Sequence, residues 1–348
     1  MTDDLEDTVL PFWVRDDEPE PPAVYARVYL DHAWRDDRIE SAWRGWRALV
    51  DQRLVPLFGP EAPAPYIEEE PTAARPLARV ERDDPSGAGI IAALGCETHR
   101  FADGEQAFLQ VYAGLGADRG RLDEVVEAVL DVLRDGAAGV DAGYGELTVG
   151  RGSPPRTGLD IALGRSAADS AGAARAALRG YEWATICPAE LADRIDPVAG
   201  AFTEIAPIAG GGLLLRATQT INGWTQDAAR RVFRSLTPVL PDGLPRRTSA
   251  ARLTRVVFAD AAEARAGRVT DLPIGPGPLP PPGPDQVSAL TEFVSQAMRH
   301  GWLTTEPPDE SAPEAIRALF PAEMGMGLTP EGQRQLAELL GLDLPDST

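Results

Sequence analysis

Hydrophobic and polar residues change their spacing along this chain in a way that separates strands from helices. From Val24 to Leu30 they alternate, which is the two-residue period of a β-strand. From Ile39 to Leu54 apolar residues recur every three or four positions, as on one face of a helix. The same strand, polar loop and helix recur twice more, with strands at Phe108–Tyr112 and Leu213–Thr218 and helices at Leu122–Leu133 and Asp227–Leu240. This order indicates either a loose internal repeat or a coincidence. Coincidence is the alternative because amphipathic helices resemble one another.

Shorter apolar runs predict further strands between these units. They are Ile90–Leu94, Glu146–Val149, Leu159–Leu163, Glu182–Cys187, Ala201–Pro207 and Leu253–Phe258. Asp103-Gly104 is a hairpin-turn signal, and Asp135-Gly136 is expected to end the second long helix. Residues 60–86 combine acids with prolines and predict a loop or an edge meander. Ala167–Leu178 is alanine-rich and is predicted to be helical.

The predicted fold class is α+β, with mixed or antiparallel sheets, helices on one face, and loosely repeated strand-loop-helix units. A small C-terminal helical appendage completes it. The expected segments are an acidic, proline-rich N-terminal segment at 1–22, a first α+β half at 23–150, a second half at 151–272, a proline-rich linker at 273–284 and a helical tail at 285–348. Thr329 followed by Pro330 predicts a helix start in the tail.

Composition narrows the classes of partner. The chain has 348 residues, 43% of them hydrophobic, which suffices for a sizeable core. Its net charge of −21 argues against nucleic acid and anionic membrane as partners, and favours encounter with a basic protein. No apolar run is long enough to span a bilayer, and the acidic start at Asp3–Asp7 is unlike a signal peptide. We therefore expect a cytoplasmic protein.

Motifs for catalysis and cofactor binding are weak. Gly87–Ala92 matches the glycine pattern of dinucleotide sites but follows no predicted strand, and Gly164–Ala168 lacks the closing glycine of a nucleophile elbow. Every basic residue is arginine, which removes lysine chemistry. Cys96 and Cys187 are expected to be buried thiols, and the three histidines lie in different predicted elements. We predict no catalytic residue, no cofactor and no metal.

Seven residues are candidates for contact with a protein partner. They are Trp34, Trp224, Glu68, Glu69, Glu70, Asp83 and Asp84. The two tryptophans occupy corresponding strand-to-helix loops of the repeat, where an exposed indole would anchor a partner; packing in the core is the alternative. The acids are either a solvated charge run or a contact surface for a basic partner. A cation cage would need them on ordered, converging backbone.

One stretch resembles a known family. The run GYEWATICPAELA from Gly180 to Ala192, the glycine-rich strand Gly211–Thr218 and the PVLPDG turn ending at Gly243 resemble the type VI immunity family of bacterial polymorphic-toxin systems. The resemblance covers mainly residues 180–245, with support from 24–58, and departs from the family pattern at Asp196-Pro197. It implies a non-catalytic cytoplasmic protein that binds and blocks a cognate toxin. No binding residue carries over.

Three functional hypotheses follow. In the first, an immunity-like inhibitor uses its acidic surface to approach a basic toxin domain. The alternative is an adaptor or scaffold protein of a bacterial secretion or injection apparatus, docked through the tail; deleting residues 285–348 would disable an adaptor but not an inhibitor. The third hypothesis, an enzyme, predicts a deep pocket in which arginine and carboxylate side chains converge.

Overall fold

A computed structural model describes most of the chain up to residue 245 and parts of the remainder. The described residues are 23–30, 36–59, 63–69, 78–84, 89–100, 107–116, 119–150, 156–196, 198–245, 253, 256–267, 274, 293, 297, 299–304 and 327–340. The chain divides into two units, Met1–Gly277 and Pro278–Thr348.

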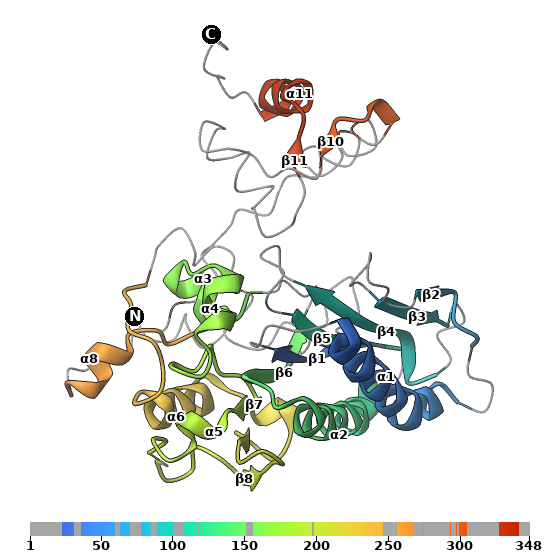
Figure 1. Cartoon of the computed structure of the whole chain (residues 1–348). Coiled ribbons are helices and arrows are strands. Elements are labelled where there is room, and N and C mark those ends of the chain that lie inside the picture. Colours follow the sequence, from blue (N-terminus) through green and yellow to red (C-terminus); the bar gives the residue numbers. More distant parts are fainter. Residues whose placement is uncertain are drawn as a thin grey trace. The chain divides into compact units, whose positions relative to one another are not determined.

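The first unit is built on one antiparallel sheet of nine strands among the described residues (Figure 1). Its strand order is β2-β3-β4-β5-β1-β6-β7-β9-β8. The strands are β1 Ala23–Leu30, β2 Ile67–Glu69, β3 Ala78–Asp83, β4 Ile91–Arg100, β5 Ala107–Leu115, β6 Tyr144–Gly150, β7 Ala184–Cys187, β8 Glu204–Pro207 and β9 Leu213–Arg216. The α+β class is confirmed, and both predicted halves contribute strands to this single sheet.

The predicted edge meander and hairpins are present. β2 and β3 form one edge of the sheet, within the acidic stretch 60–86. β4 pairs with β5, and β8 pairs with β9 across the turn that contains Gly210 and Gly211. Both glycines have a φ of +91°, a conformation that residues with a side chain rarely adopt. The turn signal at Asp103-Gly104 lies outside the described residues.

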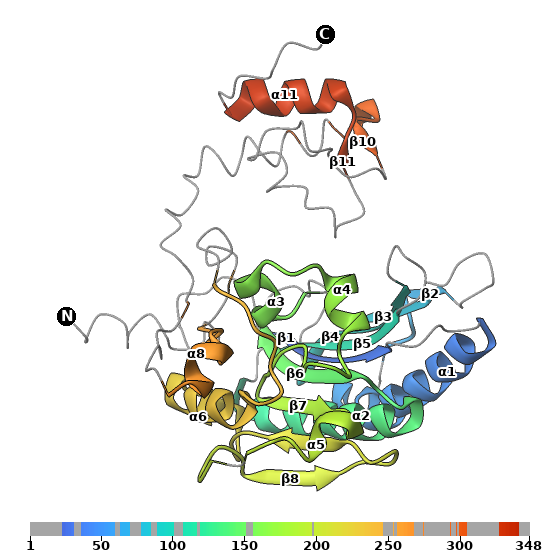
Figure 2. The ribbon, with the colours of Figure 1, turned by 60° about the vertical axis from the view of Figure 1, so that its left-hand side comes forward.

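Two long helices pack on one face of the sheet (Figures 1 and 2). They are α1 (Asp36–Arg53) and α2 (Leu122–Val140), joined to the sheet by the short 3-10 helices η3 (Val55–Phe58) and η4 (Arg119–Arg121). Alternation along β1 places Val24, Ala26 and Val28 on this face, all fully buried. The helices contribute Trp43, Trp46 and a valine-rich stripe of α2 to the same core. The spacing of apolar residues predicted both helices.

The α2 helix continues beyond its predicted end. It runs through Asp135 and Gly136 to Val140 and ends at Asp141, which takes the left-handed conformation with a φ of 49°. Gly136 faces α1 because a Cβ atom there would lie 2.4 Å from Cζ3 of Trp46. The prediction that this glycine ends the helix was wrong, since it serves close helix packing instead.

Two short helices, α3 (Gly158–Leu163) and α4 (Ala167–Gly172), lie over the opposite face of the sheet (Figures 1 and 2). The predicted strand at Leu159–Leu163 is therefore wrong. Thr157 and Asp160 form a capping box: Thr157 Oγ1 accepts from Asp160 N at 3.0 Å, and Asp160 Oδ2 accepts from Thr157 N at 3.1 Å. This local pair starts a helix where the apolar run alone suggested a strand.

The run that resembles the immunity family forms part of the core. Trp183 is fully buried and its Nε1 donates to Thr218 Oγ1 at 2.9 Å. The Arg216 guanidinium lies 4.8 Å from the centre of the Trp183 ring. Tyr181 exchanges two hydrogen bonds with the backbone of Phe258, at 2.9 and 2.7 Å. These residues therefore stabilise the fold and present no binding surface.

After β7, the predicted order of helix, hairpin and helix is observed, and a further short helix that was not predicted follows it. After β7 come α5 (Ala189–Ala192), the β8–β9 hairpin, η5 (Ile221–Gly223), α6 (Gln226–Leu236), which is capped by Thr225, and α8 (Ala261–Arg265). The predicted strand Leu253–Phe258 is wrong: its described residues form only an isolated bridge from Val257 to Ile274.

The second unit, Pro278–Thr348, contains a small cluster of its own. Phe293, Ala297, Leu328 and Leu336 are buried together, and β10 (Leu303–Thr304) pairs with β11 (Gly327–Leu328). α11 (Pro330–Leu340) begins as predicted, with Thr329 Oγ1 accepting from Gly332 N at 3.3 Å. The linker 273–284, apart from Ile274, lies outside the described residues.

Candidate functional site

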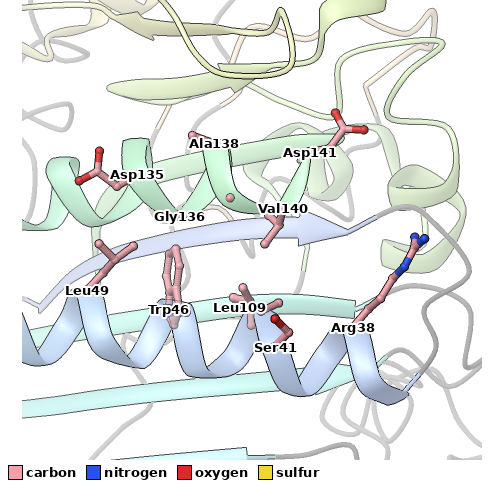
Figure 3. A pocket seen from close by; sticks show the side chains of 13 residues that line it. Arg38, Ser41, Trp46, Leu49, Leu109, Asp135, Gly136, Ala138, Val140 and Asp141 are labelled. Carbon is pink, nitrogen blue, oxygen red and sulfur yellow. The ribbon is translucent and has the colours of Figure 1, made fainter.

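An open groove of about 900 Å³ runs between α1 and α2 (Figure 3). Its lining residues come from the first three turns of α1, from the end of α2 and from β5 beneath them. They are Arg38, Ser41, Ala42, Gly45, Trp46, Leu49, Leu109, Asp135, Gly136, Ala138, Gly139, Val140 and Asp141. None of these positions was predicted as a site from the sequence.

The two helices run antiparallel and meet closely at one point. Arg53, at the end of α1, lies 3.7 Å from Asp131 and 3.4 Å from Asp135, while Trp46 touches Gly136 further along. Trp46 is fixed there because its Nε1 donates to the Gln110 carbonyl at 3.1 Å. The groove therefore has a rigid base, held by the sheet beneath it.

The floor of the groove is apolar and its rims carry charge. Leu49 lies between the helices with the buried Trp46 and Leu109 beneath it. The side chain of Asp141 points away from α1 (Figure 3), and Asp135 is ion-paired with Arg53 of α1. The Asp135 side chain is 43% exposed and that of Asp141 is 64% exposed. Arg175 lies 3.3 Å from Asp141 and holds it in place without covering it. Arg38, also exposed, stands on the α1 rim.

The acidic rim continues along the outer face of α2. This helix carries five carboxylates and one arginine. Glu124 pairs with Arg121 at 2.6 Å, and Asp131 with Arg134 at 2.8 Å. Such exposed pairs add little to stability, but they orient the carboxylates toward solvent. Asp123, Glu124 and Glu127 are exposed, so this face of α2 is solvated.

The opposite face of the sheet holds a row of polar side chains in register across six strands. The row is Arg79, Glu97, Gln110, Arg27, Glu146 and Thr185. Arg27 donates to Gln110 Oε1 at 2.8 Å and to Glu146 Oε1 at 3.0 Å. Arg27, Gln110 and Glu146 are buried. Because these groups are buried and satisfy one another, we interpret the row as structural.

Burial and neighbouring charges shift the pKa values around this row. Burial lowers the pKa of Arg27, but Tyr29 and Glu146 outweigh that effect and raise it above its usual value. Burial, reinforced by Glu146, raises the pKa of the Tyr144 hydroxyl well above its usual value. Both groups therefore keep their protons at neutral pH, with Arg27 charged and Tyr144 neutral.

A second buried cluster holds α3 and α4 together. Asp160 Oδ2 accepts from Ser170 Oγ at 2.9 Å and from Arg179 Nε at 3.0 Å. The Arg179 guanidinium in turn lies 4.0 Å from the centre of the Tyr29 ring. This cluster ties the short helices to the sheet, and its side chains are wholly buried.

The structure separates the residues predicted to contact a partner. Glu68 and Glu69 are exposed on β2, where Arg47 binds Glu68 at 2.6 Å. Asp83 is exposed at the far end of β3, and Asp84 is half-buried beside it. Since Glu69 pairs with Arg79, the two acidic clusters lie toward opposite ends of the β2–β3 pair. Their role in binding stays a prediction.

The two tryptophans proposed as anchors have different outcomes. Trp224 is 7% exposed and belongs to the hydrophobic core, so the prediction of an exposed indole is wrong at this position. Trp224 directly follows the 3-10 helix η5 and lies two residues before α6. Between these two helices the ring turns inward. Trp34 and Glu70 lie outside the described residues.

Both cysteines are buried, as predicted. Burial raises the pKa of the Cys96 thiol well above its usual value and that of Cys187 to about 12. A thiol that stays protonated is a poor nucleophile and a poor metal ligand. The groove lining contains neither cysteine, so the sulfur atoms play no part in the site.

Comparison with known proteins yields only weak structural likeness. No protein-family model matches the chain, and no curated protein matches it. Among solved structures, the chain is similar to the Pseudomonas aeruginosa T6SS protein PA0821, with 11% sequence identity, coverage of 63% of this chain and 73% of that chain, and a TM-score of 0.38. Similarity at this level assigns no function. In the described part of the chain, no helix combines the length and apolar character needed to cross a bilayer.

Proposed function

We propose that this protein is a non-catalytic, immunity-like inhibitor that binds and blocks a cognate toxin through the groove between α1 and α2. The observation that carries the proposal is the groove itself: an apolar floor on a rigid base, open to solvent and bordered by outward-pointing carboxylates. The sequence resemblance to type VI immunity proteins supplies the class of partner. The cytoplasmic, bacterial setting belongs to the same proposal.

The shape of the groove favours a protein partner over a small molecule. Small-molecule sites enclose most of the ligand and aim a few polar groups inward at it. Here the lining helices leave the groove open along its length, and the charged side chains of the α2 rim point outward. An apolar floor with a polar rim is the arrangement found at protein interfaces.

Charge supports a basic partner. The net charge of −21 and the carboxylates of α2 attract a cationic domain over a distance of about 10 Å at 0.1 M salt. Such attraction speeds encounter more than it adds affinity, so tight binding depends on apolar side chains entering the groove. The rigid base means that little ordering is needed on binding.

The test takes the protein encoded by the gene beside this one as the candidate toxin. We expect the two full-length proteins to co-purify as a complex, and co-expression of this chain to protect cells from the toxin. The association rate should fall steeply between 50 mM and 500 mM NaCl, while the dissociation rate changes little. If the proteins neither associate nor protect, the inhibitor proposal fails.

A further inference from the structure

Two glycines in the groove have no role within this chain. Gly45 lies in the middle of α1 and Gly139 in the last turn of α2, and both are exposed. A Cβ atom built on either meets no other atom within 4 Å. By contrast, Gly136 is required by the Trp46 ring. Glycine inside a helix is less favourable than alanine, so intramolecular packing does not explain Gly45 or Gly139.

We propose that the groove receives an α-helix of the partner, whose backbone approaches Gly45 and Gly139 and whose arginine or lysine side chains face Asp135 and Asp141. This inference rests on the proposed function and names the element of the partner that binds. Because glycine has no Cβ, it lets two helix backbones come close together, as small residues do at tight helix crossings.

The dimensions of the groove fit a short helical segment. Its α1 wall extends from Arg38 to Leu49, which is roughly 16 Å at 1.5 Å per residue, or about three helical turns. Ala42, Leu49 and Val140 are partly exposed and offer apolar contacts along this length, above the buried Trp46 and Leu109. An occupant with apolar residues at every third or fourth position would cover these side chains and pack across α1 and α2.

Charge determines which face of the occupant meets α2. Asp135 and Asp141 lie at the carboxyl end of α2, where the helix dipole adds partial negative charge. Cationic side chains are therefore favoured along this rim, whereas Arg38 favours an acid on the α1 rim. A second copy of this chain is a poor occupant, because two molecules with a net charge of −21 repel each other.

The experiment uses calorimetry to measure how the candidate toxin, the protein encoded by the adjacent gene, binds to full-length variants of this chain. Gly45→Leu and Gly139→Leu should each raise the dissociation constant at least 100-fold, and Gly45→Ala should raise it about 10-fold. Ala48→Leu adds the same bulk on the exposed outer side of α1 and should leave binding unchanged. Circular dichroism and thermal melting confirm that each variant is folded, as the open space around both glycines predicts.

Asp141→Asn tests the charge. It should slow association and flatten its dependence on salt, whereas the matched variant Asp169→Asn, at an exposed position on α4, should leave both unchanged. If the wild type binds and both leucine variants bind equally well, the helix-in-groove inference is overturned while the inhibitor proposal stands. If the wild type does not bind, both fall. A dimer of this chain that Gly45→Leu dissolves would show that a second copy fills the groove, and would also overturn the inference.

Discussion

Replacing Gly136 with alanine should destabilise the protein, although alanine is the better helix former. The added Cβ would lie 2.4 Å from Cζ3 and 2.5 Å from Cε3 of Trp46. The ring has no free space to move into, since it is 1% exposed and its Nε1 is bound to the Gln110 carbonyl. The contact must therefore be relieved by separating α1 from α2 or by breaking this hydrogen bond.

The opposing effects can be compared directly. Overpacking a well-filled core costs about 1–3 kcal/mol, and loss of a hydrogen bond about 1 kcal/mol more. Replacing glycine by alanine in a helix returns up to about 1 kcal/mol. The net expectation is a loss of about 1–3 kcal/mol in the free energy of unfolding, with the strain exceeding the gain in helix propensity.

Urea unfolding followed by tryptophan fluorescence and far-UV circular dichroism measures this change. Gly45→Ala is the matched control, because its Cβ meets nothing and it should stabilise the protein by up to about 1 kcal/mol. The same substitution on two neighbouring helices is thus expected to have opposite signs. Should Gly136→Ala prove as stable as Gly45→Ala, the close contact between α1 and α2 would be refuted.

Three further predictions concern the buried polar groups. Arg27→Met leaves Glu146 buried without its cation and should cost about 3–5 kcal/mol in urea unfolding. The double variant Arg27→Met with Glu146→Gln should cost less, because it also removes the buried negative charge. Thr157→Ala removes the cap of α3 and should cost about 0.5–2 kcal/mol in the same assay, whereas no loss would show that Asp160 alone starts the helix. The pKa of the Cys187 thiol is raised by burial to about 12, so its contribution to stability is complete below about pH 8.5 and is lost as the pH rises toward 12. A thermal melting series from pH 8 to pH 11 should show a decline that is smaller in Cys187→Ala.

The sequence predicted those elements that local chemistry determines. The alternation at Val24–Leu30 and the three-to-four spacing at Ile39–Leu54 became β1 and α1 because each pattern matches one buried face. The cap at Thr329 marked a helix start correctly, since a side-chain oxygen can accept from an amide only three residues away. These signals need no knowledge of distant contacts.

The sequence predictions were wrong where the conformation of a residue depends on a contact far away in the chain or on a competing local signal. Gly136 was interpreted as a helix end, but it faces Trp46, which is 90 positions earlier in the chain. The apolar run at Leu159–Leu163 suggested a strand, but the Thr157–Asp160 capping box favours a helix. The loop position of Trp224 suggested an exposed anchor, but the ring packs in the core.

The groove could not be predicted from the sequence, because its walls come from helices separated by about 80 residues. Only one sequence signal pointed toward it: Gly45 sits in the middle of an otherwise strong amphipathic helix. Recognising its meaning required the structure, which shows that no neighbour in this chain needs a glycine there. Gly136 is explained by helix packing, because it faces Trp46, whereas Gly139 has no neighbour in this chain that needs a glycine there.

Hydrogen–deuterium exchange of the full chain, alone and in complex with the candidate toxin, the protein encoded by the adjacent gene, most directly tests whether the groove binds the partner. We expect slowed amide exchange in residues 38–49 of α1 and 132–141 of α2, with β2, β8 and α11 unchanged. Protection confined to the β2–β3 edge or to the second unit, with both groove helices exchanging as in the free protein, would contradict the account.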